Sequence, residues 1–243
     1  MKLKFAALLS FLLVAIAVPS RGDSFFKVPE TLQYQLVWNG IHAGDSSLTI
    51  TDTGNSEYKI VSEAHSAKFI SLFYTVDDRA VSIVRKGSLT PLEYRIKVHE
   101  GHTRKNKEYL FPQNQMLKTT YIDYEDKDKE TFDTPPGILD PLSSFYYLRT
   151  IPLEIGKPVY VKIFDSKKVY DVKVRVIRKE RVNTWVGSFN TILVNPILKS
   201  EGIFAKKGKI YIWLTDDDKR VPVMLETGTK IGAIKAILKQ GTF

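Results

Sequence analysis

The fold is decided by the stretch Pro135-Pro136-Gly137-Ile138-Leu139-Asp140-Pro141-Leu142-Ser143-Ser144-Phe145-Tyr146-Tyr147-Leu148-Arg149. Two prolines and a glycine end any strand that precedes it, because proline cannot donate to a sheet ladder. Asp140 has the chemistry of a helix N-cap, and Pro141 stands at the first helical position, where the N–H that proline lacks has no partner anyway. The stretch therefore predicts a helix over residues 140–150.

This helix has apolar residues on both sides. One face carries Leu142, Phe145, Tyr146 and Arg149, and Leu148 lies on the opposite face. A helix that is apolar all round is buried, and about ten residues form a stable helix only when packed. We therefore expect Leu142, Phe145 and Leu148 to be buried, with the helix between two β-rich halves of the chain.

The sequence on both sides of the helix is typical of short antiparallel strands. Apolar residues alternate with other residues around 32–38, 92–98 and 210–214, and turn signals recur every eight to twelve residues. For residues 67–73 the sequence fits a short helical turn and an irregular crossing equally well. The pattern predicts a mainly β fold, an antiparallel barrel or roll of about a dozen strands with one short buried helix near the middle. One barrel and two packed sheets both fit it.

The N-terminus has the order of a secretory signal peptide. A basic start precedes an apolar run from Phe5 to Val18, and the small residues Ser20 and Gly22 precede Asp23. The run is short against the roughly 20 residues that a membrane-spanning helix needs. We expect residues 1–22 to be cleaved near Gly22-Asp23, which leaves a single β-rich domain over 23–243, without a transmembrane span, in the periplasm or outside the cell.

The chain is basic and lacks cysteine. Cleavage removes three of the 36 basic residues and none of the 27 acidic ones, so the net charge falls from +9 to +6. In an exported protein this charge favours anionic lipid, glycan or cell-wall polymer over nucleic acid as a partner, with solubility alone as the alternative. The absence of cysteine excludes disulfides, thiolate nucleophiles and cysteine-ligated metals.

Three blocks of sequence together resemble a known family. They are Trp38–Gly44, Asp140–Arg149, and Trp213–Asp217 with Arg220–Val223. They are similar to the exported bacterial proteins grouped as domain-of-unknown-function family thirty-one-oh-eight, over nearly the whole chain after the signal peptide. The resemblance implies a secreted, β-rich fold in Gram-negative bacteria. It supplies no established activity and no catalytic residues.

No motif predicts catalysis, a metal or a cofactor. His99 and His102 flank a turn rather than lying on the helix that a zinc-protease motif requires. The triplet Asp216-Asp217-Asp218 lacks the spacing and the glycine of a calcium loop. The sequence contains no Gly-x-Ser-x-Gly nucleophile elbow. An enzyme is thus the less favoured interpretation, without being excluded.

Four polar residues are expected to have structural roles: Asp140, Arg149, Asp216 and Asp217. Asp216 or Asp217 is expected to accept backbone N–H groups within its turn. Arg149 is expected to be a buried cation near the C-terminus of the helix, paired with an acid of the Asp216–Asp218 turn. The alternative is that Arg149 points into a cavity and binds the carboxylate or phosphate of a ligand.

Aromatic residues make up 12% of the chain, and some are candidates to line a cavity. The candidates are Trp38, Phe145, Tyr146 and Trp213, with plain core packing as the alternative. The favoured function is non-enzymatic binding of an apolar or amphipathic envelope component, a lipid or an envelope polymer. The alternatives are an envelope-assembly scaffold that binds another protein and a hydrolase acting on envelope polymers. A continuous apolar cavity would favour the carrier, an exposed apolar patch the scaffold, and converging titratable groups in a cleft the hydrolase.

Overall fold

The structure is a computed structural model that describes residues 26–112, 117–198, 209–229 and 232–243. The expected signal peptide and its cleavage site lie outside these residues. Within the described residues, no helix is long and apolar enough to cross a membrane.

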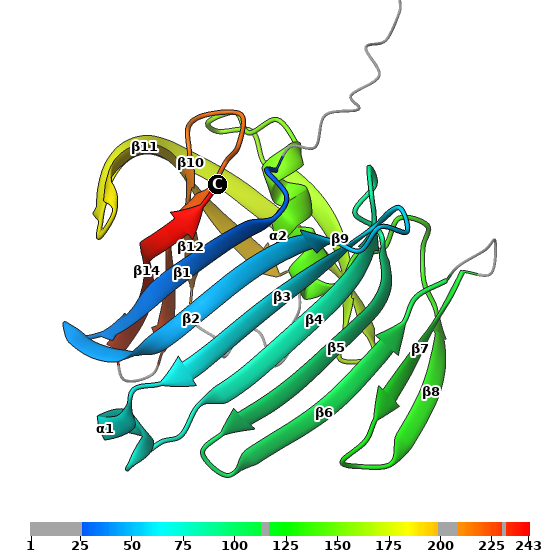
Figure 1. Ribbon diagram of the computed structural model, residues 1–243. Coiled ribbons are helices and arrows are strands. Elements are labelled where there is room, and N and C mark those ends of the chain that lie inside the picture. The colour runs from blue at the N-terminus through cyan, green and yellow to red at the C-terminus, as the bar shows by residue number, and fades with distance from the viewer. Residues whose placement is uncertain (1–25, 113–116, 199–208, 230–231) are drawn as a thin grey trace, which may run out of the picture.

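Fourteen antiparallel strands of the described chain form one sheet (Figure 1). In chain order they are β1 (Glu30–Trp38), β2 (Ile41–Asp52), β3 (Glu57–Ser66), β4 (Asp77–Arg85), β5 (Pro91–Glu100), β6 (Thr103–Leu110), β7 (Lys118–Asp123), β8 (Asp128–Asp133), β9 (Val159–Asp165), β10 (Lys168–Thr184), β11 (Gly187–Leu198), β12 (Ile210–Thr215), β13 (Pro222–Thr229) and β14 (Gly232–Thr242). The mainly β, antiparallel fold predicted from the sequence is confirmed.

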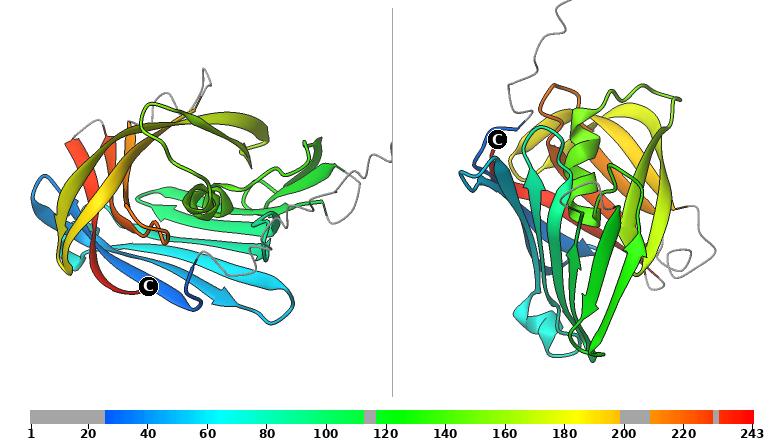
Figure 2. Two further views of the ribbon diagram at one scale, coloured as in Figure 1. Left: turned by 90° about the horizontal axis from the view of Figure 1, so that it is seen from above. Right: turned by 90° about the vertical axis from the view of Figure 1, so that its right-hand side faces the viewer.

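The order of the strands follows the chain except at one join. β1 to β8 form one meander, β9 to β14 form a second, and β1 pairs with β14. The two meanders therefore make a single curved sheet whose edges are β8 and β9. Figure 2 shows this sheet curling around helix α2 (Pro141–Thr150), which lies inside the curve.

The curl stops short of a closed barrel. No ladder between β8 and β9 occurs in the described chain, and the segment that leads into α2 partly covers β9 instead. Leu139 forms a parallel bridge with Ile163, and its carbonyl accepts the N–H of Phe164 at 2.8 Å. The edge of β9 is thus partly satisfied by the chain that connects the two meanders.

Helix α2 begins as its sequence predicts. One oxygen of Asp140 accepts the N–H groups of Leu142 and Ser143 at 2.7 and 2.9 Å, and the Ser143 hydroxyl accepts the Asp140 N–H at 3.0 Å. The Ser82 hydroxyl of β4 donates to the other Asp140 oxygen at 2.7 Å, which ties the start of the helix to the sheet. Burial raises the pKa of Asp140, although these hydrogen bonds oppose the rise.

The burial of the helix follows the prediction except at Phe145. Leu142 and Leu148 are buried, whereas Phe145 is only half-buried. The expectation for Phe145 was wrong because the space on either side of its ring is not filled by other side chains.

Short-range signals are also visible in the structure. Asn39 and Gly40 both have positive φ, 47° and 84°, as a tight hairpin turn between β1 and β2 requires. Residues 67–73 contain a short helix, α1 (Lys68–Ser71), between β3 and β4. Pro196 in β11 lies beyond the ladder with β12, which covers Thr191–Val194, so its missing N–H breaks no bond to that strand.

Candidate ligand-binding site

Two cavities flank helix α2 inside the curved sheet. The first has a volume of about 360 Å³ and the second about 310 Å³. Both are lined by the same four residues, Tyr94, Pro141, Phe145 and Leu225. The half-buried ring of Phe145 therefore lies where the two cavities meet.

The first cavity lies between α2 and the second meander. Its walls are mostly aliphatic and include Val161, Val172, Val174, Ile210 and Ile212. Among the described residues that line the two cavities, Asp165 is the one with a charged side chain. An apolar space of this kind favours a ligand that is itself mostly apolar.

The second cavity lies between α2 and the first meander, and small residues hollow it out. Ser62 of β3 stands opposite Ala80 of β4, and Ala236 of β14 stands opposite Leu225 of β13. Side chains directly opposite each other on a sheet face normally fill the space between them. Two small residues in register leave that space open.

Three groups on the walls provide unused hydrogen-bonding capacity. The hydroxyls of Ser46, Ser62 and Tyr94 have no hydrogen-bond partner among the described residues. Tyr94 is 3% exposed and lines both cavities. Burial, and then the nearby charges of Asp140 and Asp165, raise the pKa of Tyr94 well above its ordinary value. Its hydroxyl is therefore neutral and can donate to a ligand.

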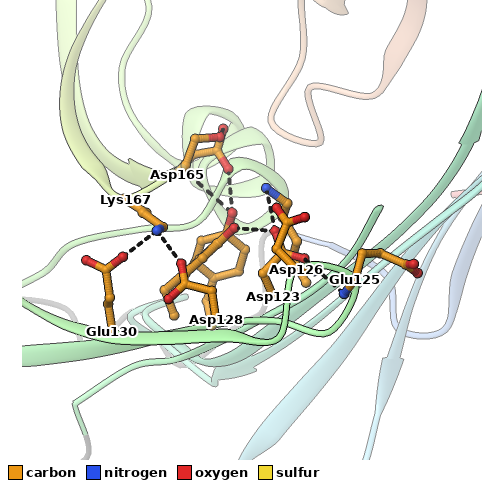
Figure 3. Close-up of polar contacts among 11 residues, drawn as sticks. Asp123, Glu125, Asp126, Asp128, Glu130, Asp165 and Lys167 are labelled. Atoms are coloured by element: carbon orange, nitrogen blue, oxygen red, sulfur yellow. Dashed lines mark hydrogen bonds and ion pairs between the residues drawn. The ribbon is translucent and has the colours of Figure 1, made fainter. Parts of the chain in front are cut away.

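A polar network holds the two edges of the sheet together beside the first cavity. The Tyr109 hydroxyl of β6 donates to Asp165 at 3.0 Å, and the Ser166 N–H donates to the same hydroxyl at 3.3 Å. Figure 3 shows Lys167, from the turn between β9 and β10, reaching Asp128 and Glu130 of β8. Side chains thus connect the two edge strands β8 and β9, between which the described chain forms no backbone ladder. We call this junction the seam.

Asp123 organises the β6–β8 side of this seam. It accepts a hydrogen bond from the Tyr121 hydroxyl at 2.7 Å, pairs with Lys107 at 3.2 Å and accepts the N–H groups of Glu125 and Asp126 (Figure 3). Burial raises the pKa of Asp123, but the hydrogen bonds lower it more, so the net pKa is below the ordinary value.

Arg149 does not pair with an acid of the Asp216–Asp218 turn. Its guanidinium binds Glu30 of β1 through two hydrogen bonds, at 2.7 and 2.8 Å, and both side chains are about 1% exposed. The turn contributes only the Lys219 carbonyl, at 3.1 and 3.3 Å. The guanidinium also lies over the ring of Phe26, 4.6 Å from its centre. The expected partner was wrong because Glu30, at the start of β1, binds the guanidinium, while Asp216 binds Lys179 and Asp217 binds groups of its own turn.

Asp217 has its partners within its own turn, whereas Asp216 has a partner on β10. One oxygen of Asp217 accepts the Thr215 hydroxyl at 2.6 Å and the N–H groups of Lys219 and Arg220 at 3.1 and 3.0 Å. Asp216 pairs with Lys179 of β10 at 2.7 Å. These contacts shape the turn between β12 and β13, which does not line either cavity.

Of the four aromatic candidates, the structure places one on the cavities. Phe145 lines both, whereas Tyr146 is fully buried and packs edge-on against Phe26, with ring centres 5.2 Å apart. The Trp213 ring is buried in the core, and its N–H donates to Glu180 at 2.7 Å. Trp38 is half-buried at the end of β1 and lines neither cavity.

The histidines do not assemble a metal site. The described residues contain no group of three or more side chains that could hold a metal ion. His42 and His65 each pair with one aspartate, Asp45 at 3.4 Å and Asp77 at 2.9 Å.

Most cavity residues were missed by sequence reasoning. Ser46, Ser62 and Ala80 line the second cavity from strands that also carry buried Leu48, Ile60 and Val84, and small residues among such inward positions are the one signal that could have revealed them. Tyr94 was recognised only as one member of an alternating strand. Its position between the cavities depends on which strands are opposite one another.

The fold and its interior define a barrel-like β protein with a helix and two cavities inside a curved sheet. The chain belongs to the family described as "Protein of unknown function (DUF3108)", which matches residues 33–239. The family resemblance seen in the sequence is thereby confirmed. A comparison with curated proteins gives no significant match.

Solved structures with a similar fold share little sequence with this chain. One is the beta-barrel-like protein of the domain of unknown function DUF1849 from Brucella abortus, with a TM-score of 0.60 and 11% identity, covering 89% of this chain and 98% of that one. A protein from Bacteroides fragilis, described as exported with a YmcC-like fold, has a TM-score of 0.36 and 11% identity over 90% and 97% of the two chains. At such identities the first likeness shows the fold alone, and the second carries no argument.

Proposed function

We propose that this protein is exported to the periplasm and binds an apolar or amphipathic component of the cell envelope, without catalysis, in the cavities on either side of α2. The observation that carries the proposal is the junction between them, where Phe145 offers an apolar ring and Tyr94 a free hydroxyl. A lipid or another amphipathic envelope molecule has the matching chemistry.

The size and lining of the cavities support this function. Sites for small molecules typically measure about 300 to 1,000 Å³ and combine apolar walls with a few polar groups. Each cavity reaches that range, and the two share their central residues. An apolar chain would lie against the aliphatic walls of the first cavity. A polar group would bond to the hydroxyls of Tyr94, Ser46 and Ser62.

The charged groups of the site favour binding over catalysis. General acid–base work needs titratable side chains that converge on one reacting atom. Asp165 is the single carboxylate on the described cavity walls, and it already accepts the hydroxyls of Tyr109 and Ser166.

Export rests on the N-terminal sequence. The basic start, the apolar run and the small residues before Asp23 are those of a secretory signal peptide. Sequencing the N-terminus of the protein from a periplasmic fraction tests this part. A chain that still begins at Met1 would contradict it.

Native mass spectrometry of the protein purified without detergent tests the binding. We expect an additional mass that organic extraction removes. The variant Ala80→Phe fills the second cavity from β4, and its control Val81→Phe places the same ring on the outer face of that strand. The adduct should be lost in Ala80→Phe and kept in Val81→Phe, with thermal unfolding recorded for both.

A more conservative variant tests the polar contact. Tyr94→Phe removes only a hydroxyl and should weaken binding of the extracted ligand about five- to tenfold, because one unmade hydrogen bond costs about 1 to 1.5 kcal/mol. Wild-type protein without an adduct that also fails to bind envelope lipid extract, or equal adducts in Ala80→Phe and wild type, would refute the proposed function.

A further inference from the structure

The two cavities face different parts of the curved sheet. The second is lined from β14 and from β1 to β4, and the first is lined from β5 and from β9 to β13. Among the described strands, only β5 and β13 contribute to both walls, through Tyr94 and Leu225. These two strands therefore form the boundary between the cavities.

Side chains that are neighbours on the sheet lie on either side of this boundary. Ala80 of β4 stands opposite Ile96 of β5, and the first of these lines the second cavity while the other lines the first. Leu225 of β13 stands opposite Ala236 of β14, on the second cavity, and opposite Ile212 of β12, on the first. The two cavities thus adjoin directly.

Four residues line both cavities, and we call them the waist: Tyr94, Pro141, Phe145 and Leu225. Phe145 and Leu225 are half-buried, and each packs against both of the apolar clusters that form the core. A phenylalanine in a helix has two favoured χ1 rotamers, and unfilled space beside its ring lets it change between them at little cost. The ring of Phe145 can therefore move aside for a chain that passes the waist.

The cavities differ in chemistry on the two sides of the waist. The hydroxyls of Ser46 and Ser62 line the second cavity and have no hydrogen-bond partner among the described residues. The first cavity is mostly aliphatic, and its carboxylate, Asp165 at the end of β9, already accepts the hydroxyls of Tyr109 and Ser166. A molecule that is polar at one end and apolar at the other matches both cavities only if it extends through the waist.

The volume of the first cavity limits the apolar part of such a molecule. An apolar cavity of about 150 Å³ holds one benzene ring, so about 360 Å³ has room for roughly twelve carbon atoms. This is one acyl chain. A second chain would have to lie in the second cavity, where it would leave the serine hydroxyls without partners.

We propose that the interior binds one single-chain amphiphile, with its polar group in the second cavity and its chain in the first, passing the Phe145 ring at the waist. The inference rests on the proposed function and specifies its ligand class, a monoacyl rather than a diacyl lipid. Phe145 is then a residue that determines specificity, because its ring leaves room at the waist for one chain only.

Isothermal titration calorimetry of the delipidated protein tests this inference with two glycerol esters, below their micelle concentrations. Monolauroylglycerol carries its acyl carbons in one chain, and dihexanoylglycerol carries the same number in two. We expect the single-chain ester to bind at least tenfold more tightly, because only one short chain of the other enters the first cavity. Native mass spectrometry should show one molecule of monolauroylglycerol on each protein.

A series of monoacylglycerols measures the space for the chain. The affinity should rise about fourfold with each added methylene, since each one buries more apolar surface. It should level off at roughly twelve carbons, when the first cavity is full.

Two variants of α2 separate the first cavity from the rest of the helix. Ser144 lines only the first cavity, and its hydroxyl donates to the Pro141 carbonyl at 2.8 Å. Ser144→Phe therefore fills that cavity and should lower the affinity for monolauroylglycerol at least tenfold. The control Thr150→Phe removes an equivalent bond, to the Tyr147 carbonyl at 2.9 Å, at a position that lines neither cavity, and should bind like the wild type.

Phe145→Ala widens the waist and should reduce the difference in affinity between the two esters. Thermal unfolding of each variant shows whether it is folded. The comparison of the two esters needs only the wild type, so it stands even if Ser144→Phe fails to fold.

The outcomes separate this inference from the proposed function. Equal affinity for the two esters, two molecules of monolauroylglycerol on each protein, or undiminished binding by folded Ser144→Phe would overturn the single-chain assignment and leave envelope-lipid binding standing. If the wild type binds neither ester nor any component of an envelope lipid extract, the proposed function fails together with this inference.

Discussion

The buried pair of Arg149 and Glu30 connects the end of α2 to the first strand, and Arg149→Met should destabilise the protein strongly. The substitution removes two charge-assisted hydrogen bonds of 2.7 and 2.8 Å and two bonds to the Lys219 carbonyl. It also leaves the Glu30 carboxylate charged and without its partner at 1% exposure. Breaking a buried pair in this way costs about 3 to 5 kcal/mol.

The cost can be separated from the loss of packing by a double-mutant cycle. Replacing both members of a buried pair with apolar residues is often neutral or stabilising, by about 1 to 4 kcal/mol. We therefore expect Arg149→Met with Glu30→Leu to recover most of the stability that Arg149→Met loses. The coupling energy should be at least about 2 kcal/mol.

Urea unfolding followed by tryptophan fluorescence and circular dichroism measures these differences. In thermal unfolding of a domain of this size, the midpoint of Arg149→Met should lie about 6 to 20 °C below that of the wild type. Arg178→Met, which breaks an exposed pair with Glu180, serves as the control and should cost less than about 1 kcal/mol. A loss below about 1 kcal/mol in Arg149→Met, or a double variant no more stable than the single one, would refute the reasoning.

Three further predictions concern the helix, the seam and the cavities. Asp140→Ala removes the N-cap and leaves a buried serine hydroxyl of β4 unpaired, so urea unfolding should show a loss of about 2 to 3 kcal/mol. Burial raises the pKa of Asp123, but its bonds to Tyr121, Asp126 and a lysine lower it more, so its pKa in the fold is below the ordinary value. The unfolded chain therefore binds more protons in acid than the folded one. The stability that the Asp123 carboxylate provides is present above about pH 4 and is lost as the pH falls through its folded pKa. In Asp123→Asn, the thermal unfolding midpoint should therefore fall less steeply as the pH is lowered in acid. Phe145→Ala joins the two cavities. Because the ring is only half-buried, the substitution should lower the free energy of unfolding by less than a fully buried phenylalanine would, for which the loss is about 3 to 5 kcal/mol. A loss in that range or above it on urea unfolding would count against the cavities.

The local elements could be predicted from the sequence because their causes are local. The start of α2 depends on Asp140 and Pro141, whose effects act within three residues along the chain. The turn at Asn39-Gly40 depends on two residues that tolerate positive φ. Alternation with a period of two was enough to predict most strands, since it reports which face of a strand is buried.

Residue contacts across the sheet could not be predicted in this way. The sequence indicated that Arg149 needs a buried acid, since an unpaired interior charge is costly, but it could not show which acid. Glu30 lies 119 residues away and meets Arg149 only because β1 joins the two meanders beside the end of α2.

What the sequence by itself determined is the class of fold, the central helix with its cap, the turns and the family. Only the tertiary structure decided that β1 pairs with β14, that Tyr109 and Asp165 meet across the seam, and that Ser62 stands opposite Ala80 to hollow a cavity. The physical reason is the range of the interactions. Helix caps and turns are fixed by dihedral angles and hydrogen bonds within a few residues. Strand order and register are fixed by many weak contacts between distant segments, and the cavities are the space that those contacts leave unfilled.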